Sequence, residues 1–288
     1  MLLRDSSTLP RTLVARPDTK ALPRILCLHG GGVNAAIFEA QSRSLIRHLE
    51  TSFHLVWANA PFFCDPHPDV VEVYGPYGPF RRWLRAFPEH AEIDDEACIE
   101  EIGYAMRTAM ENDSRKGATG EWVGLMGFSQ GSKVCASILL EQQAREARAE
   151  KEGELIVPVG LTNIPNLHWR FGILMAGSAP LINLKPEILT SPALIGAGDI
   201  PSERFWAGRK MDKEAVVRIP TLHVHGSADA GIHLHQKLLY DYCSKESTRL
   251  VEWEGTHRVP LRSRDVVPVV HAIYDTAEKT GVRVNRPV

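Results

Sequence analysis

Short apolar runs alternate with longer segments of helical periodicity from about residue 24 onward. Six runs are expected to be strands: 24–28, 53–58, 122–126, 171–176, 219–225 and 249–253. Five helices are expected between or after these runs: 36–50, 94–112, 131–142, 231–244 and 264–280. In the first two, apolar residues recur three or four positions apart. The charged stretch 141–154 is expected to extend the third helix into solvent. Strands that are apolar throughout are typical of a buried parallel sheet.

This alternation predicts an α/β fold with a mostly parallel central sheet that helices flank on both faces. The chain has no internal repeat and no break in composition, so residues 1–288 are expected to form a single domain. Residues 1–22 are expected to be an extended N-terminal segment. Residues 59–92 are rich in proline, glycine and aromatic residues without clear periodicity. They predict a long loop or lid insertion that covers a substrate.

Composition narrows the class of protein further. The 33 basic and 35 acidic residues give a formal net charge of −2, which offers no basic surface for nucleic acid or an anionic membrane. No apolar run is long enough to span a bilayer, and the N-terminus lacks the apolar core of a secretory signal. The five cysteines form no CxxC pair and no disulfide framework. We therefore expect a cytoplasmic protein.

The sequence GFSQG at 127–131 matches the pattern G-x-S-x-G directly after an apolar strand. This pattern is typical of a sharp strand-to-helix turn that lifts the serine into an exposed, strained position. Glycine is favoured on both sides because a Cβ atom would clash in so tight a turn. Ser129 is therefore the candidate nucleophile. The following helix would direct its N-terminal amides at developing negative charge.

The sequence HGGG at 29–32 directly follows the first predicted strand. A backbone N–H from such a loop, together with one from the residue after the nucleophile, can bind the oxyanion of a tetrahedral intermediate. The predicted donors are Gly31, or its neighbour Gly32, and Gln130. A plain glycine-rich turn and a phosphate-binding loop are the alternatives. Neither G-x-x-x-x-G-K-[ST] nor G-x-G-x-x-G is present to complete a nucleotide site.

A serine needs a base to activate it and a carboxylate to orient that base. In this type of fold the chain order is serine, acid, histidine. Asp229 comes just after the strand 219–225, and His257 follows the strand 249–253. Both positions lie at the carboxyl edge of the predicted sheet, where ligands bind in open α/β folds. Ser129, Asp229 and His257 are therefore the predicted catalytic triad.

The sequence offers other titratable residues as alternatives to this triad. Asp199 is the reserve candidate for the acid. His29 is assigned to the glycine turn, so it is not the expected general base. Two pairs of alternating histidines could suggest a metal site: His223 and His225, then His233 and His235. Without a carboxylate or cysteine arranged to complete such a site, we interpret them as core or surface histidines and expect no metal.

Six segments give the chain a resemblance to a known family: RILCLHGGGVNAAIFEAQ (24–41), NAPF (59–62), YGPYGPFRRWL (74–84), VGLMGFSQGSKV (123–134), PTLHVHGSAD (220–229) and GTHRVP (255–260). The chain resembles the fungal FSH-type serine hydrolases of the α/β-hydrolase fold, in particular the stand-alone thioesterases of fungal polyketide pathways. The resemblance implies the same triad and the same oxyanion donors.

The segment 59–92 supplies the predicted substrate contacts. Four of its aromatic residues could form an apolar wall for an acyl chain: Phe62, Tyr74, Phe80 and Trp83. The alternative is that they anchor a long loop to the core. Arg81, Arg82 and Arg85 could meet an acidic carrier protein, although a solvated basic turn is the favoured interpretation.

These observations predict a serine hydrolase that cleaves an acyl thioester without a metal or an organic cofactor. The substrate would be a small-molecule or carrier-bound acyl group, such as a polyketide chain on the acyl carrier protein of a synthase. An acyltransferase and a carboxylesterase share the same triad and remain alternatives. A non-catalytic, ligand-binding protein on the same scaffold is a more distant one.

Overall fold

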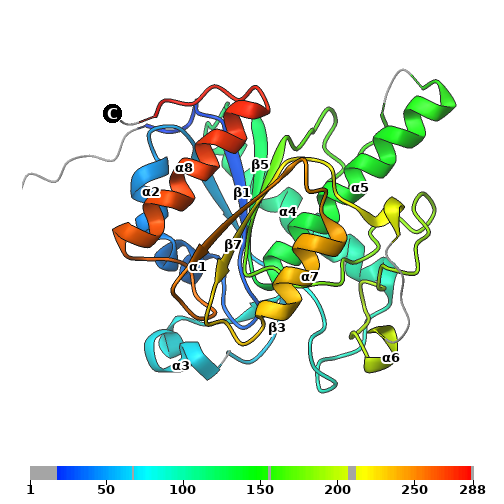
Figure 1. The fold of residues 1–288 in the computed structure, drawn as a ribbon, viewed down its shortest axis with the longest axis horizontal. Coiled ribbons are helices and arrows are strands. Elements are labelled where there is room, and N and C mark those ends of the chain that lie inside the picture. The colour runs from blue at the N-terminus through cyan, green and yellow to red at the C-terminus, as the bar shows by residue number, and fades with distance from the viewer. Residues whose placement is uncertain (1–17, 67, 155–156, 207–211, 287–288) are drawn as a thin grey trace, which may run out of the picture.

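A six-stranded parallel sheet runs through the computed structural model, which describes residues 18–66, 68–154, 157–206 and 212–286 (Figure 1). The strand order is β2-β1-β5-β6-β7-β8, and every neighbouring pair is parallel. The strands are β1 (Arg24–Leu28), β2 (His54–Ala58), β5 (Trp122–Phe128), β6 (Phe171–Met175), β7 (Thr221–Gly226) and β8 (Thr248–Trp253). The predicted parallel sheet is therefore confirmed.

Helices cover both faces of this sheet, as predicted (Figure 1). One face packs against α4 (Asp95–Arg115), α5 (Gln130–Glu152) and α7 (Ile232–Tyr242). The other face packs against α1 (Ala35–Gln41), α2 (Arg43–Leu49) and α8 (Ser263–Lys279). Successive residues of β1 alternate between the two apolar clusters, since Leu26 joins the first and Cys27 the second. None of the described helices is both long enough and apolar enough to cross a membrane.

The structure differs from the sequence-based expectation in several elements. The segment 36–50 is two helices rather than one, because Ser42 leaves the α-helical region with φ −88° and ψ 7°. Of the predicted N-terminal segment, residues 1–17 lie outside the described residues. Residues 18–22 contain a turn closed by a hydrogen bond from Leu22 N to Thr19 O (2.9 Å). The structure also contains a short helix, α6 (Glu203–Trp206), and a 3₁₀ turn, η2 (Lys213–Ala215), which are too short to produce a periodic pattern.

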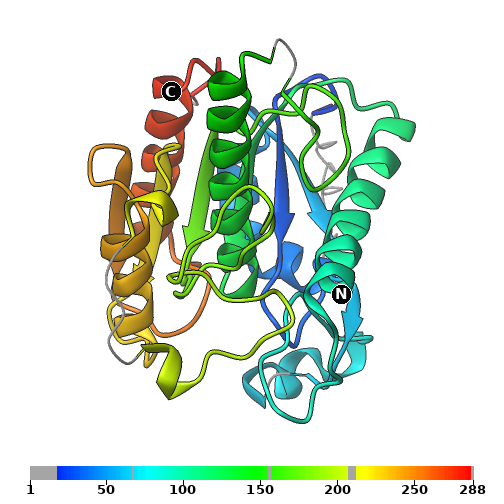
Figure 2. The ribbon, with the colours of Figure 1, turned by 90° about the vertical axis from the view of Figure 1, so that its right-hand side faces the viewer.

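The segment 59–92 contains regular structure that its sequence did not reveal. It holds β3 (Phe62–Phe63), α3 (Pro68–Tyr74), the 3₁₀ turn η1 (Gly75–Tyr77) and β4 (Arg81–Arg82). β3 and β4 form a separate antiparallel pair. These elements are too short to produce a periodic pattern. In Figure 2 the strand arrowheads point toward the end of the molecule that carries this segment, which therefore lies at the carboxyl edge of the sheet.

Two backbone hydrogen bonds tie β4 to the glycine loop after β1. Gly32 N donates to Arg81 O (3.0 Å), and Arg81 N donates to Val33 O (2.8 Å). The side-chain amide of Asn34 adds bonds to the carbonyl oxygens of Tyr77 (2.8 Å) and Pro79 (3.1 Å). The segment 59–92 is therefore held against the loop that is expected to bind the oxyanion.

Two neighbouring histidine rings on β7 are buried without a hydrogen-bond partner among the described residues. His223 and His225 have no exposed surface, and no described group bonds to any of their four ring nitrogens. Burial lowers the pKa of His223 to about 3 and that of His225 to about 4. Both imidazoles are therefore neutral at neutral pH.

Replacing His223 by leucine is expected to weaken the pH dependence of stability. Its folded-state pKa of about 3 lies below the ordinary 6.5, so between these values only the unfolded chain binds the proton. With respect to His223, the folded protein is thus most stable above pH 6.5, and it loses stability as the pH falls from there toward about 3. Between about pH 7 and about pH 5 the free energy of unfolding should fall by roughly 2 kcal/mol less in His223→Leu than in wild type. Urea unfolding measures this, and equal losses would contradict the prediction.

Candidate active site

Ser129 occupies a strained turn between β5 and α5. β5 ends at Phe128 and α5 begins at Gln130, so the serine alone makes the turn. Its backbone has φ 52° and ψ −116°, a conformation that residues with a Cβ atom rarely adopt. A hydrogen bond from Ser129 N to Met175 O (2.8 Å) fixes the turn to the end of β6. The structure therefore has the strand-to-helix turn that the motif predicted.

The two glycines that flank this turn have no room for a side chain. A Cβ atom on Gly127 would lie 2.4 Å from Ser132 N. A Cβ atom on Gly131 would lie 2.1 Å from Leu28 O, at the end of β1. Both contacts are with backbone atoms that cannot move aside. Close packing of α5 against the sheet is therefore the physical reason for glycine at both positions.

The structure brings Ser129, His257 and Asp229 into one line of hydrogen bonds. Ser129 Oγ lies 2.9 Å from His257 Nε2, and His257 Nδ1 lies 2.7 Å from Asp229 Oδ2. The carboxylate can only accept, so Nδ1 carries the proton and Nε2 is free to accept from the serine hydroxyl. The His257 side chain is 37% exposed, whereas that of Asp229 is 2% exposed. This arrangement can deprotonate the serine from the solvent-facing side.

The loops that carry the acid and the histidine are bonded to each other. Asp229 lies between β7 and α7, and His257 lies between β8 and α8. Ala228 N donates to Gly255 O (2.9 Å), and Ser227 N donates to Trp253 O (2.9 Å). These backbone bonds fix the separation of the two loops, and with it the distance between the acid and the histidine.

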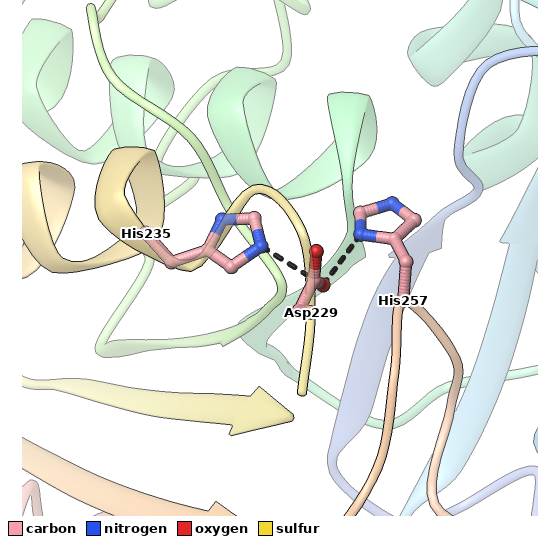
Figure 3. Close-up of side chains that lie close together, drawn as sticks. All are labelled: Asp229, His235 and His257. Carbon is pink, nitrogen blue, oxygen red and sulfur yellow. Dashed lines mark hydrogen bonds and ion pairs between the residues drawn. The ribbon is translucent and has the colours of Figure 1, made fainter. Parts of the chain in front are cut away.

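The Asp229 carboxylate is buried but well supplied with donors. Gly231 N donates to its Oδ1 (2.8 Å), while His257 and His235 both bond to Oδ2, at 2.7 and 3.0 Å. Figure 3 shows the two imidazole rings on opposite sides of the carboxylate. Burial alone would raise the pKa of Asp229. The bonds from Gly231, His235 and His257 outweigh burial and hold that pKa below its ordinary value.

Two backbone amides near Ser129 are available to bind an oxyanion. Gly31 lies beside Gln130, since a Cβ atom on this glycine would be 3.4 Å from the Gln130 side chain. Gly32 N is already bonded to Arg81 O (3.0 Å). Among the described residues, neither Gly31 N nor Gln130 N has a hydrogen-bond partner. Of the two glycines considered as donor, Gly31 is therefore the one with a free N–H.

The Gln130 side chain also anchors the segment 59–92 next to the nucleophile. Its Oε1 accepts from Trp83 N (2.7 Å) and Leu84 N (3.1 Å), and its Nε2 donates to Leu84 O (3.0 Å). The indole of Trp83 is fully buried and donates to His29 O (2.9 Å). Trp83 therefore supports the glycine loop. Three further aromatic residues predicted to contact substrate are half-buried, and for them that role stays a prediction: Phe62, Tyr74 and Phe80.

The interpretation of three arginines as a solvated basic turn is wrong, because none of them is exposed. Arg81 donates to Ala60 O (2.9 Å), and Arg85 donates to His90 O (3.1 Å). Arg82 is 5% exposed, and its Nε and Nη1 have no partner among the described residues. Arg81 and Arg85 are thus bonded within the segment 59–92, while the Arg82 guanidinium lies 5.0 Å from the centroid of the Phe62 ring.

The alternative acid and base lie elsewhere or are already engaged. Asp199 lies beside Asp95 at the start of α4, where both carboxylates approach Gly196. His29 is fully buried, and its Nε2 accepts from Ala60 N (3.0 Å). Burial lowers the pKa of His29 to about 4, so this imidazole is neutral. Neither Asp199 nor His29 replaces a member of the predicted triad.

Sequence reasoning missed the position of His235, which it interpreted as a core or surface residue. Its ligand atom lies within 4.8 Å of those of Asp229 and His257, a grouping that could in principle hold a metal. The two contacts of 2.7 and 3.0 Å are hydrogen-bond lengths. Ligands around a tetrahedral zinc ion, with bonds of about 2.0–2.1 Å, would be about 3.3 Å apart. These distances therefore fit hydrogen bonds between the three side chains rather than coordination of a metal ion.

The chain is similar to known serine hydrolases and esterases. The family model described as serine hydrolase (FSH1) matches residues 19–269. The esterase pigG of Monascus ruber is 48% identical over 280 residues, which cover 95% of this chain and 98% of the relative. The probable esterase tazC of Aspergillus terreus is 47% identical over 266 residues, which cover 91% and 95%.

A solved structure shows the same fold at low sequence identity. The acyl-protein thioesterase 2 of Zea mays has a TM-score of 0.50 and 19% identity, and the match covers 91% of this chain and 96% of that one. The strained serine turn, the parallel sheet and the family match thus lead to one conclusion. The chain belongs to the FSH1 serine hydrolase family and has the α/β-hydrolase fold.

Proposed function

We propose that this serine hydrolase cleaves an acyl thioester and releases a polyketide acyl chain from the acyl carrier protein of a synthase. The observation that carries the hydrolytic chemistry is the unbroken contact from Ser129 through His257 to Asp229, next to two free backbone amides. The thioester and the carrier protein rest on the resemblance to the thioesterases of fungal polyketide pathways.

In the first half of the proposed reaction, Ser129 attacks the acyl carbonyl while His257 Nε2 takes its proton. Asp229 holds the imidazole in the tautomer that can accept this proton, and it stabilises the imidazolium that forms. Gly31 N and Gln130 N bind the oxyanion, an interaction that contributes about 3 kcal/mol per donor in comparable sites. The histidine then protonates the departing thiolate, which leaves an acyl group on the serine.

In the second half, water replaces the thiol as the nucleophile. The His257 side chain is 37% exposed, so water can approach the imidazole that served the serine. The histidine deprotonates the water, and collapse of the second oxyanion frees the carboxylic acid and the serine. No metal or organic cofactor takes part in this scheme. Hydrolysis of an oxygen ester is the second candidate, because the relatives reported above are named esterases.

Replacing Ser129 by alanine is expected to abolish both covalent labelling and turnover. Intact-protein mass spectrometry after treatment with a fluorophosphonate should show one adduct on the wild type and none on Ser129→Ala. The value of kcat/KM should fall on the order of 10⁴-fold or more, because the nucleophile is gone. Ser132→Ala is the matched control, since Ser132 Oγ is buried and donates to Met175 O (2.8 Å). An adduct that persists on Ser129→Ala would overturn the assignment of the nucleophile.

The substrate class is tested with one acyl group on three leaving groups. We expect kcat/KM to be highest for a β-ketoacyl group on the phosphopantetheine of an acyl carrier protein. The matching N-acetylcysteamine thioester should follow, lower by about tenfold or more, which corresponds to about 1.4 kcal/mol of lost recognition. The matching oxygen ester should be the slowest. A faster oxygen ester would favour a carboxylesterase, and equal rates for the two thioesters would contradict carrier recognition.

A further inference from the structure

His235 approaches the predicted triad from the side opposite His257 (Figure 3). It lies on α7 and is 2% exposed, and its Nε2 is 3.0 Å from Asp229 Oδ2. The same oxygen accepts the bond from His257 Nδ1 at 2.7 Å. A catalytic triad needs only one histidine bonded to its carboxylate, which here is His257. The bond from His235 to the same carboxylate therefore requires a separate explanation.

Both ring nitrogens of His235 face groups that can only accept hydrogen bonds. Nδ1 lies 2.9 Å from Gly177 O, in the loop after β6, and Nε2 faces the ionised Asp229 carboxylate. A neutral imidazole carries one N–H and could satisfy only one of these acceptors. The hydrogen-bond partners therefore require the doubly protonated, cationic ring.

We propose that His235 is a cationic positioning residue, which holds the Asp229 carboxylate by an ion pair and thereby sets the pH range in which His257 acts as a base. This inference rests on the proposed role of the triad. Among the described residues, His235 bonds to Asp229 and Gly177 and has no hydrogen bond to Ser129, so it acts through Asp229. The cation offsets part of the negative charge of Asp229 that acts on His257.

The charged and titratable groups around His235 place a single positive charge in this cluster. From β7, the His225 ring lies 5.6 Å from the His235 ring between centroids, and His223 lies behind His225. Burial lowers the pKa of His225 to about 4 and that of His223 to about 3, so both are neutral. Asp229 and His257 are the other titratable groups that face His235 among the described residues.

Among the described residues, the ion pair of His235 is with Asp229, and its ring contacts are with His225 and His257. Gly177 is pressed against the first turn of α5, where a Cβ atom on this glycine would lie 2.7 Å from Ser132 Cβ. On α7 itself, His233 is exposed, and Lys237 pairs with Asp241. The Asp229–His235 pair is thus a buried ion pair with one further partner, His257.

The distance between the two histidine rings makes the effect measurable. Their centroids are 5.8 Å apart. A unit positive charge at such a distance, with an effective dielectric constant near 20, shifts a titration by about one to two pH units. Removing the charge should therefore move the acid limb of the kcat/KM profile to higher pH by about that amount.

The test compares His235→Gln with His233→Gln, the same substitution on the exposed side of the same helix. Glutamine can still donate a hydrogen bond to Asp229 but carries no charge. The readouts are the pH profile of kcat/KM for an activated ester and the rate of Ser129 labelling by a fluorophosphonate. In His235→Gln the acid limb of both profiles should move up by about one pH unit or more, while His233→Gln should match wild type. A lower rate with an unmoved acid limb would overturn the proposal.

A second measurement on the unmodified protein does not depend on activity or on the folding of a variant. Nitrogen-15 NMR of the histidine rings distinguishes a doubly protonated imidazole from either neutral tautomer. His235 is expected to carry a proton on both nitrogens at about pH 7, while His223 and His225 are neutral. A neutral His235 would refute the charged role even if Ser129 proves to be the nucleophile. A cationic His235 in a protein that no fluorophosphonate labels would refute only the proposed function.

Discussion

The carboxylate of Asp229 is the interaction on which the geometry of the site depends. It accepts hydrogen bonds from Gly231 N, His235 and His257. Through His235, which also donates to Gly177 O, the carboxylate connects the ends of β6, β7 and β8. A buried carboxylate without such partners would be costly, on the order of several kcal/mol. The Asp229 carboxylate, which the proposed chemistry needs, therefore also holds together the loops that follow β6, β7 and β8.

A second constraint comes from close packing at the ends of β1 and β5. The strained backbone of Ser129 persists because its neighbours leave no alternative: Gly127 and Gly131 are pressed against backbone atoms, and Ser129 N is bonded to the end of β6. The same packing places Gly31 beside Gln130, so the nucleophile and the two free amides share one rigid frame. Preorganised donors of this kind need no rearrangement during the reaction.

The segment 59–92 adds a third layer to this frame. Gln130 binds the backbone of Trp83 and Leu84, while Gly32 binds Arg81. Whatever moves this segment would therefore also move the oxyanion loop and the residue after the nucleophile. This coupling gives a physical reason for a long insertion at the carboxyl edge of the sheet, where ligands of open α/β folds bind.

Much of this architecture could be predicted from the sequence, because it depends on local patterns. The sequence alone shows the apolar strands and the periodic helices. It also shows the order of Ser129, Asp229 and His257 along the chain. The role of His235 leaves none, because it depends on how one turn of α7 is oriented toward a carboxylate. Likewise, Gly31 and Gly32 are equivalent in the sequence, and only the bond from Gly32 N to Arg81 O distinguishes them.

The regular elements within 59–92 escaped prediction because two-residue strands have no period. Burial of Arg82 escaped it as well, since a run of arginines is usually solvated. Both features arise from contacts between distant parts of the chain, which one sequence does not encode in any local pattern.

A crystal structure of the protein covalently bound to a phosphonate ester would test the arrangement of the nucleophile and the two amides. Phosphorus should be bonded to Ser129 Oγ, with the phosphonyl oxygen about 2.7–3.1 Å from both Gly31 N and Gln130 N. Asp229 should still bond to His257 and to His235. A phosphonyl oxygen that points away from these amides, or phosphorus bonded to another residue, would contradict the account.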